Sequence, residues 1–223
     1  MQTITEHNPP ADSPPFAEQQ TAPLILRGIT WQTYESLLAD LGEQSGLRLT
    51  YDQGTLEIMT LTPEHESINR YLSSLVDMLV DELAMDVHPV GSATFRREDI
   101  DRGFEPDSSF YFAGAAQMRG KKRIDLSVEP APELALEIDI SHSSLDKLSV
   151  MARFGVSEVW RYDGAHVHIY VLSEGAFVTR ESSSIFPALS SATIQEFLNL
   201  SQTLTRQELK HWLRTQLVAP EAD

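Results

Sequence analysis

The sequence predicts an α/β domain in which a mixed β-sheet is flanked by helices. Segments with apolar residues at helical spacing are interspersed with short alternating or continuous apolar segments, which are typical of strands. Hydrophobic residues make up 41% of the chain, which is enough for one sizeable core. The length of 223 residues suits one domain with tails better than two full domains. We expect a single domain at residues 25–218, a flexible tail at residues 1–24 and a short C-terminal tail at residues 219–223.

The N-terminal third predicts a helix, a hairpin and a second helix. Thr30 suits the N-cap of the first helix. The hairpin is expected over residues 47–60, turning at residues 52–54, where Gly54 readily takes a positive φ. Thr62 and Pro63 suit the N-cap and first position of the second helix. The apolar positions are Trp31, Tyr34, Leu37, Leu38 and Leu41 in the first helix and Ile68, Leu72, Leu75, Val76, Leu79 and Leu83 in the second.

The middle of the chain is expected to add four strands. Two are short, around residues 87–90 and 94–97. A third, at residues 107–112, is entered through a proline, and a loop at residues 113–132 leads to a strongly apolar fourth strand at residues 134–140.

The C-terminal third predicts a helix, a group of strands and two more helices. Ser143 suits the cap of the first helix, which Gly155 ends. Strands are expected at residues 158–162 and 166–172, joined by Asp163-Gly164, with a further arm near residues 176–179. The last helix is expected to bury Leu209, Trp212, Leu213 and Leu217.

Composition excludes several classes of chemistry. The chain has no cysteine, which rules out disulfides, thiolate zinc sites and a cysteine nucleophile. No apolar run has the length of a membrane span, and the N-terminus lacks the order of a signal peptide, so a cytoplasmic location is the default expectation. The 33 acidic and 17 basic residues give a net charge of −16. Any contact with nucleic acid is therefore expected to be local, metal-assisted or weak.

Two acidic residues interrupt the apolar strand at residues 134–140. Since side chains alternate between the faces of a strand, Glu137 and Asp139 share one face and the large aliphatic residues share the other. The two carboxylates repel each other unless water or a cation lies between them. On this pair alone, a half-exposed strand with its polar face in solvent is the simpler interpretation.

Two further charged residues accompany this strand. Asp107 follows Pro106 at the start of the preceding long strand, and Lys147 lies in the first turns of the following helix. Alone, an acid beside proline is most often part of a turn, and a helix lysine is usually solvated. Their combination with Glu137 is less easily accidental and indicates a carboxylate–carboxylate–lysine site.

The order of these motifs resembles the Uma2 family (DUF820), which is abundant in cyanobacteria. The segments that carry the resemblance are YDQGTLEIMT, PEHE, EPDSSFY, LALEIDIS and LDKLSVMARFGVSEVWRYD, and it runs from about Thr30 to about Leu172. The resemblance implies a restriction-endonuclease-like fold with a site of the PD-(D/E)xK type.

By motif position, the resemblance implies that Asp107 and Glu137 are ligands of Mg²⁺ or Mn²⁺. The usual lysine position holds Asp139, which leaves the number of metals open and makes Asp139 a third candidate ligand. Lys147 from the next helix takes the place of that lysine and would stabilise charge on a phosphate. Glu64, in the first turn of the long helix, is expected either to hold a metal-bound water or only to interact with the helix dipole.

The resemblance implies a metal-dependent endonuclease acting on nucleic acid, with DNA the favoured substrate and a homodimer compatible with two strands. The alternative is a catalytically weak or inactive nuclease-shaped module that binds DNA or a partner protein. A metal hydrolase with another substrate is a third interpretation. Glu57 is interpreted as a polar-face residue, His166 and His168 as surface histidines, and the basic run at residues 119–123 as a solvated loop or a phosphate contact.

Overall fold

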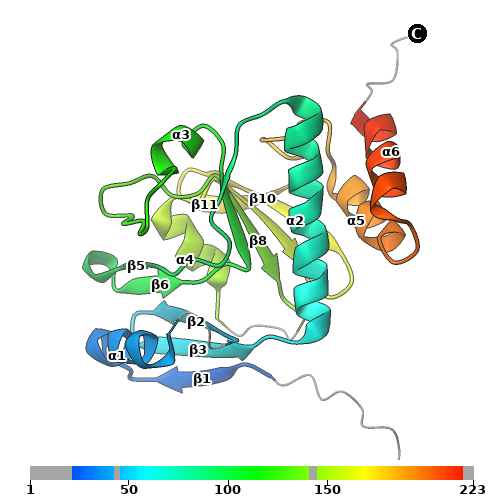
Figure 1. Ribbon diagram of the computed structural model, residues 1–223. Helices are drawn as coiled ribbons and strands as arrows, with labels where there is room; N and C mark the ends of the chain where they lie inside the picture. The colour runs from blue at the N-terminus through cyan, green and yellow to red at the C-terminus, as the bar shows by residue number, and fades with distance from the viewer. Residues whose placement is uncertain (1–21, 43–45, 141–144, 218–223) are drawn as a thin grey trace, which may run out of the picture.

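The computed structural model describes residues 22–42, 46–140 and 145–217, which form two β-sheets and the helices that cover them (Figure 1). The sequence predicted one mixed sheet. The structure instead separates an antiparallel sheet from a mixed one, because two strands that the sequence did not predict, β1 and β6, extend the N-terminal hairpin into a sheet of its own.

The first sheet has the strand order β1-β3-β2-β6-β5, and every pair is antiparallel. Its strands are β1 (Leu24–Arg27), β2 (Leu47–Asp52), β3 (Thr55–Thr60), β5 (Phe95–Arg97) and β6 (Arg102–Phe104). The predicted hairpin is confirmed as β2 and β3, with Gln53 and Gly54 at φ of 45° and 87° in the turn. Helix α1 (Trp31–Leu41), capped by Thr30 as predicted, packs on this sheet.

A close contact explains the glycine in β6. Tyr34 of α1 is fully buried and stacks on Tyr51 of β2, with the ring centroids 4.8 Å apart. A Cβ at Gly103 would lie 2.2 Å from the Tyr34 hydroxyl oxygen, so only glycine fits beneath the ring.

The second sheet has the order β11-β10-β9-β8-β7-β4. Its strands are β4 (His88–Pro89), β7 (Ser108–Tyr111), β8 (Leu134–Ile138), β9 (Glu158–Tyr162), β10 (Val167–Ser173) and β11 (Ala176–Arg180). Only the β8–β9 pair is parallel, and helix α4 (Lys147–Phe154) lies between these two strands in the chain. The predicted mixed sheet is therefore confirmed here.

Helices cover both faces of the second sheet. Helices α2 (Pro63–Leu83) and α5 (Ser191–Leu200) pack on one face, and α6 (Arg206–Leu217) packs on α5 (Figure 1). Helix α4 packs on the other face and also contacts β6, so it lies where the two sheets meet. Thr62 caps α2 and Pro63 begins it, as predicted.

Some predicted boundaries were wrong. The expected loop at residues 113–132 contains a short helix, α3 (Ala115–Met118), and a 3₁₀ turn (Glu98–Ile100) precedes β6. Strand β8 ends at Ile138, two residues earlier than expected. Helix α4 begins at Lys147 with Asp146 as its N-cap; the predicted cap, Ser143, lies outside the described residues.

The ends of the described chain bear on two further expectations. Residues 1–21 and 218–223 lie outside the described residues, and β1 begins at Leu24. In α6, Leu209 and Leu213 are buried, but Trp212 and Leu217 are only partly buried because they lie at the edge of the core. Within the described chain, none of the helices combines the length and apolar character needed to cross a membrane.

Candidate active site

Six charged or ionisable side chains gather at the junction of the two sheets. Each comes from a different element: Arg48 from β2, Glu57 from β3, His65 from the first turn of α2, Asp107 from the residue before β7, Glu137 from β8 and Lys147 from the first position of α4. Glu57, His65, Asp107 and Glu137 are each less than 5% exposed. We call these six residues the charged cluster.

Asp107 replaces a backbone partner at the end of the β7–β8 ladder. Pro106 has no N–H with which to continue the ladder. The Asp107 side chain instead accepts a hydrogen bond from the Ile138 N–H at its Oδ2 atom, at 2.8 Å, while its own N–H donates to Leu136 O at 3.1 Å. These bonds bring Asp107 beside the strand that carries Glu137.

Lys147 lies between two acids from different sheets. Its Nζ donates to Glu137 Oε2 at 3.3 Å and lies 3.8 Å from Glu57 Oε1. The Ser149 N–H donates to the Asp146 side chain and so caps the helix at this point. Lys147 is therefore the first residue of α4. Asp107, Glu137 and Lys147, predicted from separate segments, are thus brought together.

The electrostatics of the charged cluster follow from its burial. Burial raises the pKa of Glu137 above its ordinary value, the Lys147 ammonium lowers it in part, and the charge of Asp107 raises it again. Burial alone would lower the pKa of Lys147, but the charges of Glu137 and Asp107 outweigh it, so this pKa is raised and the ammonium stays protonated. The Lys147 ammonium therefore offsets only part of the cost of burying a charge on Glu137.

Each of the two central carboxylates has one oxygen held by protein donors and one that is not. Asp107 Oδ2 and Glu137 Oε2 have the partners given above. Asp107 Oδ1 and Glu137 Oε1 are buried, and within the described chain no hydrogen-bond donor reaches either atom. The nearest charge to Asp107 Oδ1 is Arg48 Nε, at 3.8 Å.

These two oxygens fit a hard divalent cation. Mg²⁺ prefers oxygen ligands and keeps several waters, so two carboxylates suffice to hold it. Among residues 22–42, 46–140 and 145–217, no group of three or more acidic or histidine side chains is arranged as a metal site. The donor set therefore suits an ion held by Asp107 and Glu137 and otherwise by water.

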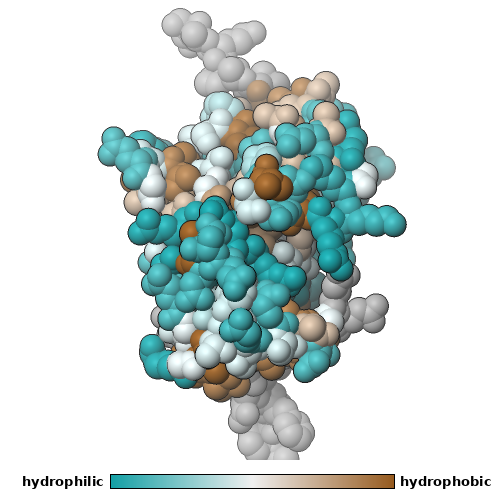
Figure 2. Space-filling model, turned by 90° about the vertical axis from the view of Figure 1, so that its left-hand side faces the viewer, coloured by the Kyte–Doolittle hydropathy of each residue, from teal (hydrophilic) through white to brown (hydrophobic). Residues whose placement is uncertain are grey.

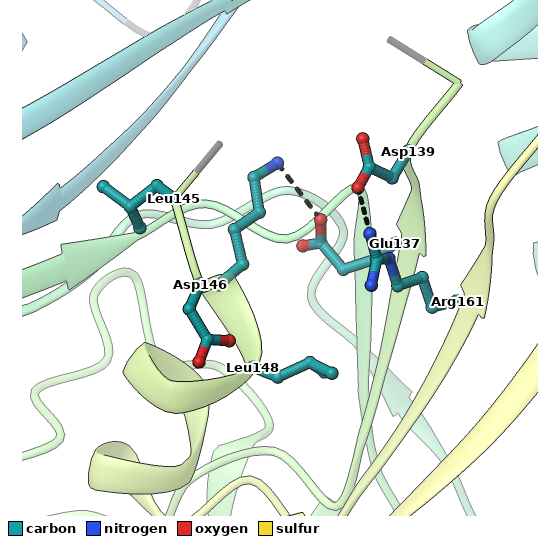
Figure 3. Close-up of a pocket in the computed structure, with 7 residues that line it drawn as sticks. Glu137, Asp139, Leu145, Asp146, Leu148 and Arg161 are labelled. Carbon is teal, nitrogen blue, oxygen red and sulfur yellow. Dashed lines mark hydrogen bonds and ion pairs between the residues drawn. The ribbon is translucent and has the colours of Figure 1, made fainter. Parts of the chain in front are cut away.

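Asp139 lines the same pocket as Glu137 but has a different partner. Its Oδ2 forms an ion pair with Arg161 of β9, and its N–H donates to Tyr162 O at 2.8 Å. The pocket, about 250 Å³ in volume, is lined by Glu137, Asp139, Leu145, Asp146, Lys147, Leu148 and Arg161 (Figure 3). Both acids face it, as the alternation of the strand predicted, but the interpretation of a half-exposed strand was wrong: Asp139 is only 4% exposed.

The remaining predicted residues have their contacts outside the charged cluster. Glu64 is exposed. Burial raises the pKa of Tyr162, and the negative charge of Glu64 raises it further. His168 pairs with Asp163 at 2.8 Å. In the basic run, Arg119 forms an ion pair with Asp86, and Lys121 forms one with Glu129.

Sequence reasoning missed Arg48, Glu57 and His65. Glu57 was interpreted as a polar-face residue, yet it is 1% exposed, with the Lys147 Nζ atom 3.8 Å from its Oε1. One signal for His65 was available: it begins a polar series with Asn69 and Ser73, spaced four residues apart on the side of the helix that also carries apolar residues such as Leu72 and Val76. Nothing in the local sequence distinguishes Arg48.

A mixed sheet that carries Asp107 and Glu137 on neighbouring strands, with Lys147 on the next helix, defines a restriction-endonuclease-like protein. The sequence model of the Uma2 family, described as "Putative restriction endonuclease", matches residues 31–207, and the chain belongs to this family. This confirms the resemblance found in the sequence and extends it beyond Leu172.

A solved structure shares the fold. It is described as that of "a putative nuclease belonging to DUF820" from Anabaena variabilis ATCC 29413, and the match has a TM-score of 0.50 at 14% sequence identity. The match covers 72% of this chain and 96% of that chain. No curated protein matches this chain.

Proposed function

We propose that this protein is a divalent-metal-dependent nuclease that hydrolyses phosphodiester bonds, with DNA as the favoured substrate. The observation that carries the proposal is the pair of buried oxygens, Asp107 Oδ1 and Glu137 Oε1, that lack hydrogen-bond donors in the described chain, on a cluster in which Lys147 donates to the other Glu137 oxygen, Oε2. Proteins of the restriction-endonuclease-like class generally use divalent metals.

The residues of the charged cluster have different roles in the proposed reaction. Asp107 and Glu137 hold Mg²⁺ or Mn²⁺ through their second oxygens. When bound, such an ion polarises the phosphate and lowers the pKa of the attacking water. Lys147, fixed between Glu137 and Glu57, neutralises charge that grows on the phosphate oxygens.

The acidic surface shapes the choice of partner. At a net charge of −16, the molecule repels a polyanion over most of its surface, so contact with nucleic acid is confined to the site and helped by the metal. The face in Figure 2 is mainly hydrophilic, with scattered hydrophobic residues. A homodimer that presents two sites to a duplex stays a prediction, and sedimentation analysis tests it.

The test is cleavage of plasmid DNA and of single-stranded RNA with Mn²⁺ or Mg²⁺, and with a chelator. We expect metal-dependent cleavage that Glu137→Ala abolishes, since the variant lacks one of two protein ligands. The matched control is Glu181→Gln, which removes an exposed carboxylate on another part of the molecule and leaves cleavage intact. Lack of cleavage of every substrate by the metal-loaded wild type would contradict the proposal.

A second candidate is a nuclease-shaped binding or assembly module. The observation that favours it is the ion pair of Asp139 with Arg161. Asp139 occupies the position at which the common motif has its lysine. Calorimetric titration with Mn²⁺ separates the two functions. Binding that is lost in Asp107→Asn supports the nuclease, and absence of binding to the wild type supports the module.

A further inference from the structure

One face of α2 carries three polar side chains in register with the segment that holds Asp107. His65, Asn69 and Ser73 are spaced four residues apart, so they project from the same side of the helix. The helix is otherwise apolar on this side and packs on the core of the second sheet. Polar residues in such a place need partners, and Asp107 and Ser108 provide them.

Asn69 fixes the main chain at Asp107. Its Nδ2 donates to Asp107 O at 3.1 Å, and its Oδ1 accepts from Ser108 Oγ at 2.9 Å. Ser73 adds a contact between its Oγ and Ser108 Oγ at 3.0 Å. Asn69 is only 6% exposed, so these bonds are shielded from water.

His65 acts on the side chain of Asp107. Its Nε2 lies 3.1 Å from Asp107 Oδ2, an ion-pair contact without hydrogen-bond geometry, while the same oxygen accepts a hydrogen bond from the Ile138 N–H. A carboxylate without a proton can only accept, so Nε2 carries the hydrogen. The rotation of an aspartate carboxyl group about its last torsion is soft, and the Ile138 hydrogen bond together with the His65 ion-pair contact at the same oxygen restricts it.

We infer that His65 is a positioning residue: it holds Oδ2 of Asp107 on the protein side, so that Oδ1 is the oxygen presented to the cation, while Asn69 fixes the backbone beneath it. This inference rests on the proposed metal-dependent function. It adds to that function by naming what orients the ligand Asp107: two residues, His65 and Asn69, in the first two turns of α2.

The test compares His65→Ala with His168→Ala, which removes a histidine from an exposed histidine–aspartate pair on β10. Two properties are measured on each folded protein. One is the Mn²⁺ dissociation constant by calorimetry. The other is the amide proton resonance of Ile138 in metal-free protein, which reports its hydrogen bond to Asp107 Oδ2. His65→Gln, which retains a donor, is the conservative variant.

We expect His65→Ala to weaken Mn²⁺ binding roughly 10- to 100-fold, the usual effect of removing a partner of a metal ligand. We also expect it to move the Ile138 amide resonance upfield, because Asp107 is then free to rotate. His65→Gln should recover part of both effects, and His168→Ala should change neither.

Three outcomes overturn the inference. Unchanged Mn²⁺ affinity and an unchanged Ile138 resonance would show that His65 does not hold Asp107. Weakened affinity with an unchanged resonance would make His65 a ligand itself. If the wild type binds no Mn²⁺, the proposed function fails, but the Ile138 resonance still decides the role of His65: no shift in His65→Ala overturns it. Should His65→Ala not fold, the same measurements on His65→Phe decide, since this variant keeps a planar ring but has no donor for Asp107 Oδ2.

Discussion

Lys147 brings a positive charge to within 4 Å of two buried carboxylates that belong to different sheets. Removing one partner of a buried ion pair leaves the other charge without compensation, and such losses typically cost about 3–5 kcal/mol. Lys147 therefore stabilises the fold in addition to its proposed role in catalysis.

For Lys147→Met, we expect the free energy of unfolding to fall by about 3–5 kcal/mol, because the buried acids Glu57 and Glu137 both lose the ammonium that lies within 4 Å of each. Urea denaturation measures the change, and Lys122→Met, at an exposed position, is the control. Stability equal to that of the wild type would show that the acids take up protons at no cost.

His65 reports the charge of Asp107 through its own titration. Burial by itself lowers the pKa of His65, but the contact with Asp107 and the charges of Glu137 and Glu66 raise it above its usual value. Because folding raises this pKa, the interaction stabilises the protein below about pH 6.5. That contribution is lost as the pH rises through the pKa of the folded state.

In Asp107→Asn without added metal, we expect the pKa of His65 to fall, since burial then dominates. Histidine NMR spectra recorded across the pH range measure the change, with His168 as an internal control. A pKa of His65 that is the same in the variant and in the wild type would show that Asp107 does not set it.

At the scale of elements, the start of α2 links stability to the site. Thr62 Oγ1 accepts from His65 N at 3.2 Å, so the same turn that begins the helix also presents His65. Helix α1 has an equivalent cap, from Thr33 N to Thr30 Oγ1 at 3.2 Å, on a helix that contributes no residue to the charged cluster.

We expect Thr62→Ala and Thr30→Ala each to lower stability by about 1 kcal/mol. Only Thr62→Ala should also weaken Mn²⁺ binding, because it loosens the turn that carries His65. Thermal denaturation and calorimetry on both variants test this. Equal Mn²⁺ affinity in the two variants would show that the Thr62 cap does not contribute to metal binding.

At the scale of the whole molecule, charge limits how nucleic acid is held. The 17 basic residues include a run at residues 119–123 in which two members are already paired with acids. Lys122 and Arg123, also in this run, are exposed. We therefore expect the proposed binding of a duplex to release few counterions.

For Glu137→Gln, which we expect to bind DNA without cutting it, we expect a shallow dependence of affinity on salt, equivalent to roughly three phosphate contacts or fewer. Fluorescence anisotropy over a range of salt concentrations gives the slope. Lys122→Ala combined with Arg123→Ala should reduce it further if this loop touches the backbone. A slope typical of six or more contacts would contradict the expectation of a local interface.

The sequence by itself determined the elements whose signals are local. The apolar spacing of residues 68–83, the Thr62-Pro63 start and the Gly54 turn were sufficient for α2 and for the β2–β3 hairpin. The order of the motifs was sufficient for the family. It also predicted that Asp107, Glu137 and Lys147 lie together, and their role as a site stays a prediction. Boundaries and the short strands β1 and β6 were not determined in this way, since three or four residues have little pattern of their own and are held by pairing with distant strands.

Only the tertiary structure decided which acids are buried and what they meet. Glu57 looks like a surface residue along its strand, and it becomes part of the charged cluster because Lys147, 90 positions away, packs over it at the junction of two sheets. His65 and Asp107 likewise meet across 42 positions. The physical reason is that burial and charge compensation depend on neighbours in space, and chain-local patterns contain no record of which distant residue fills a given gap.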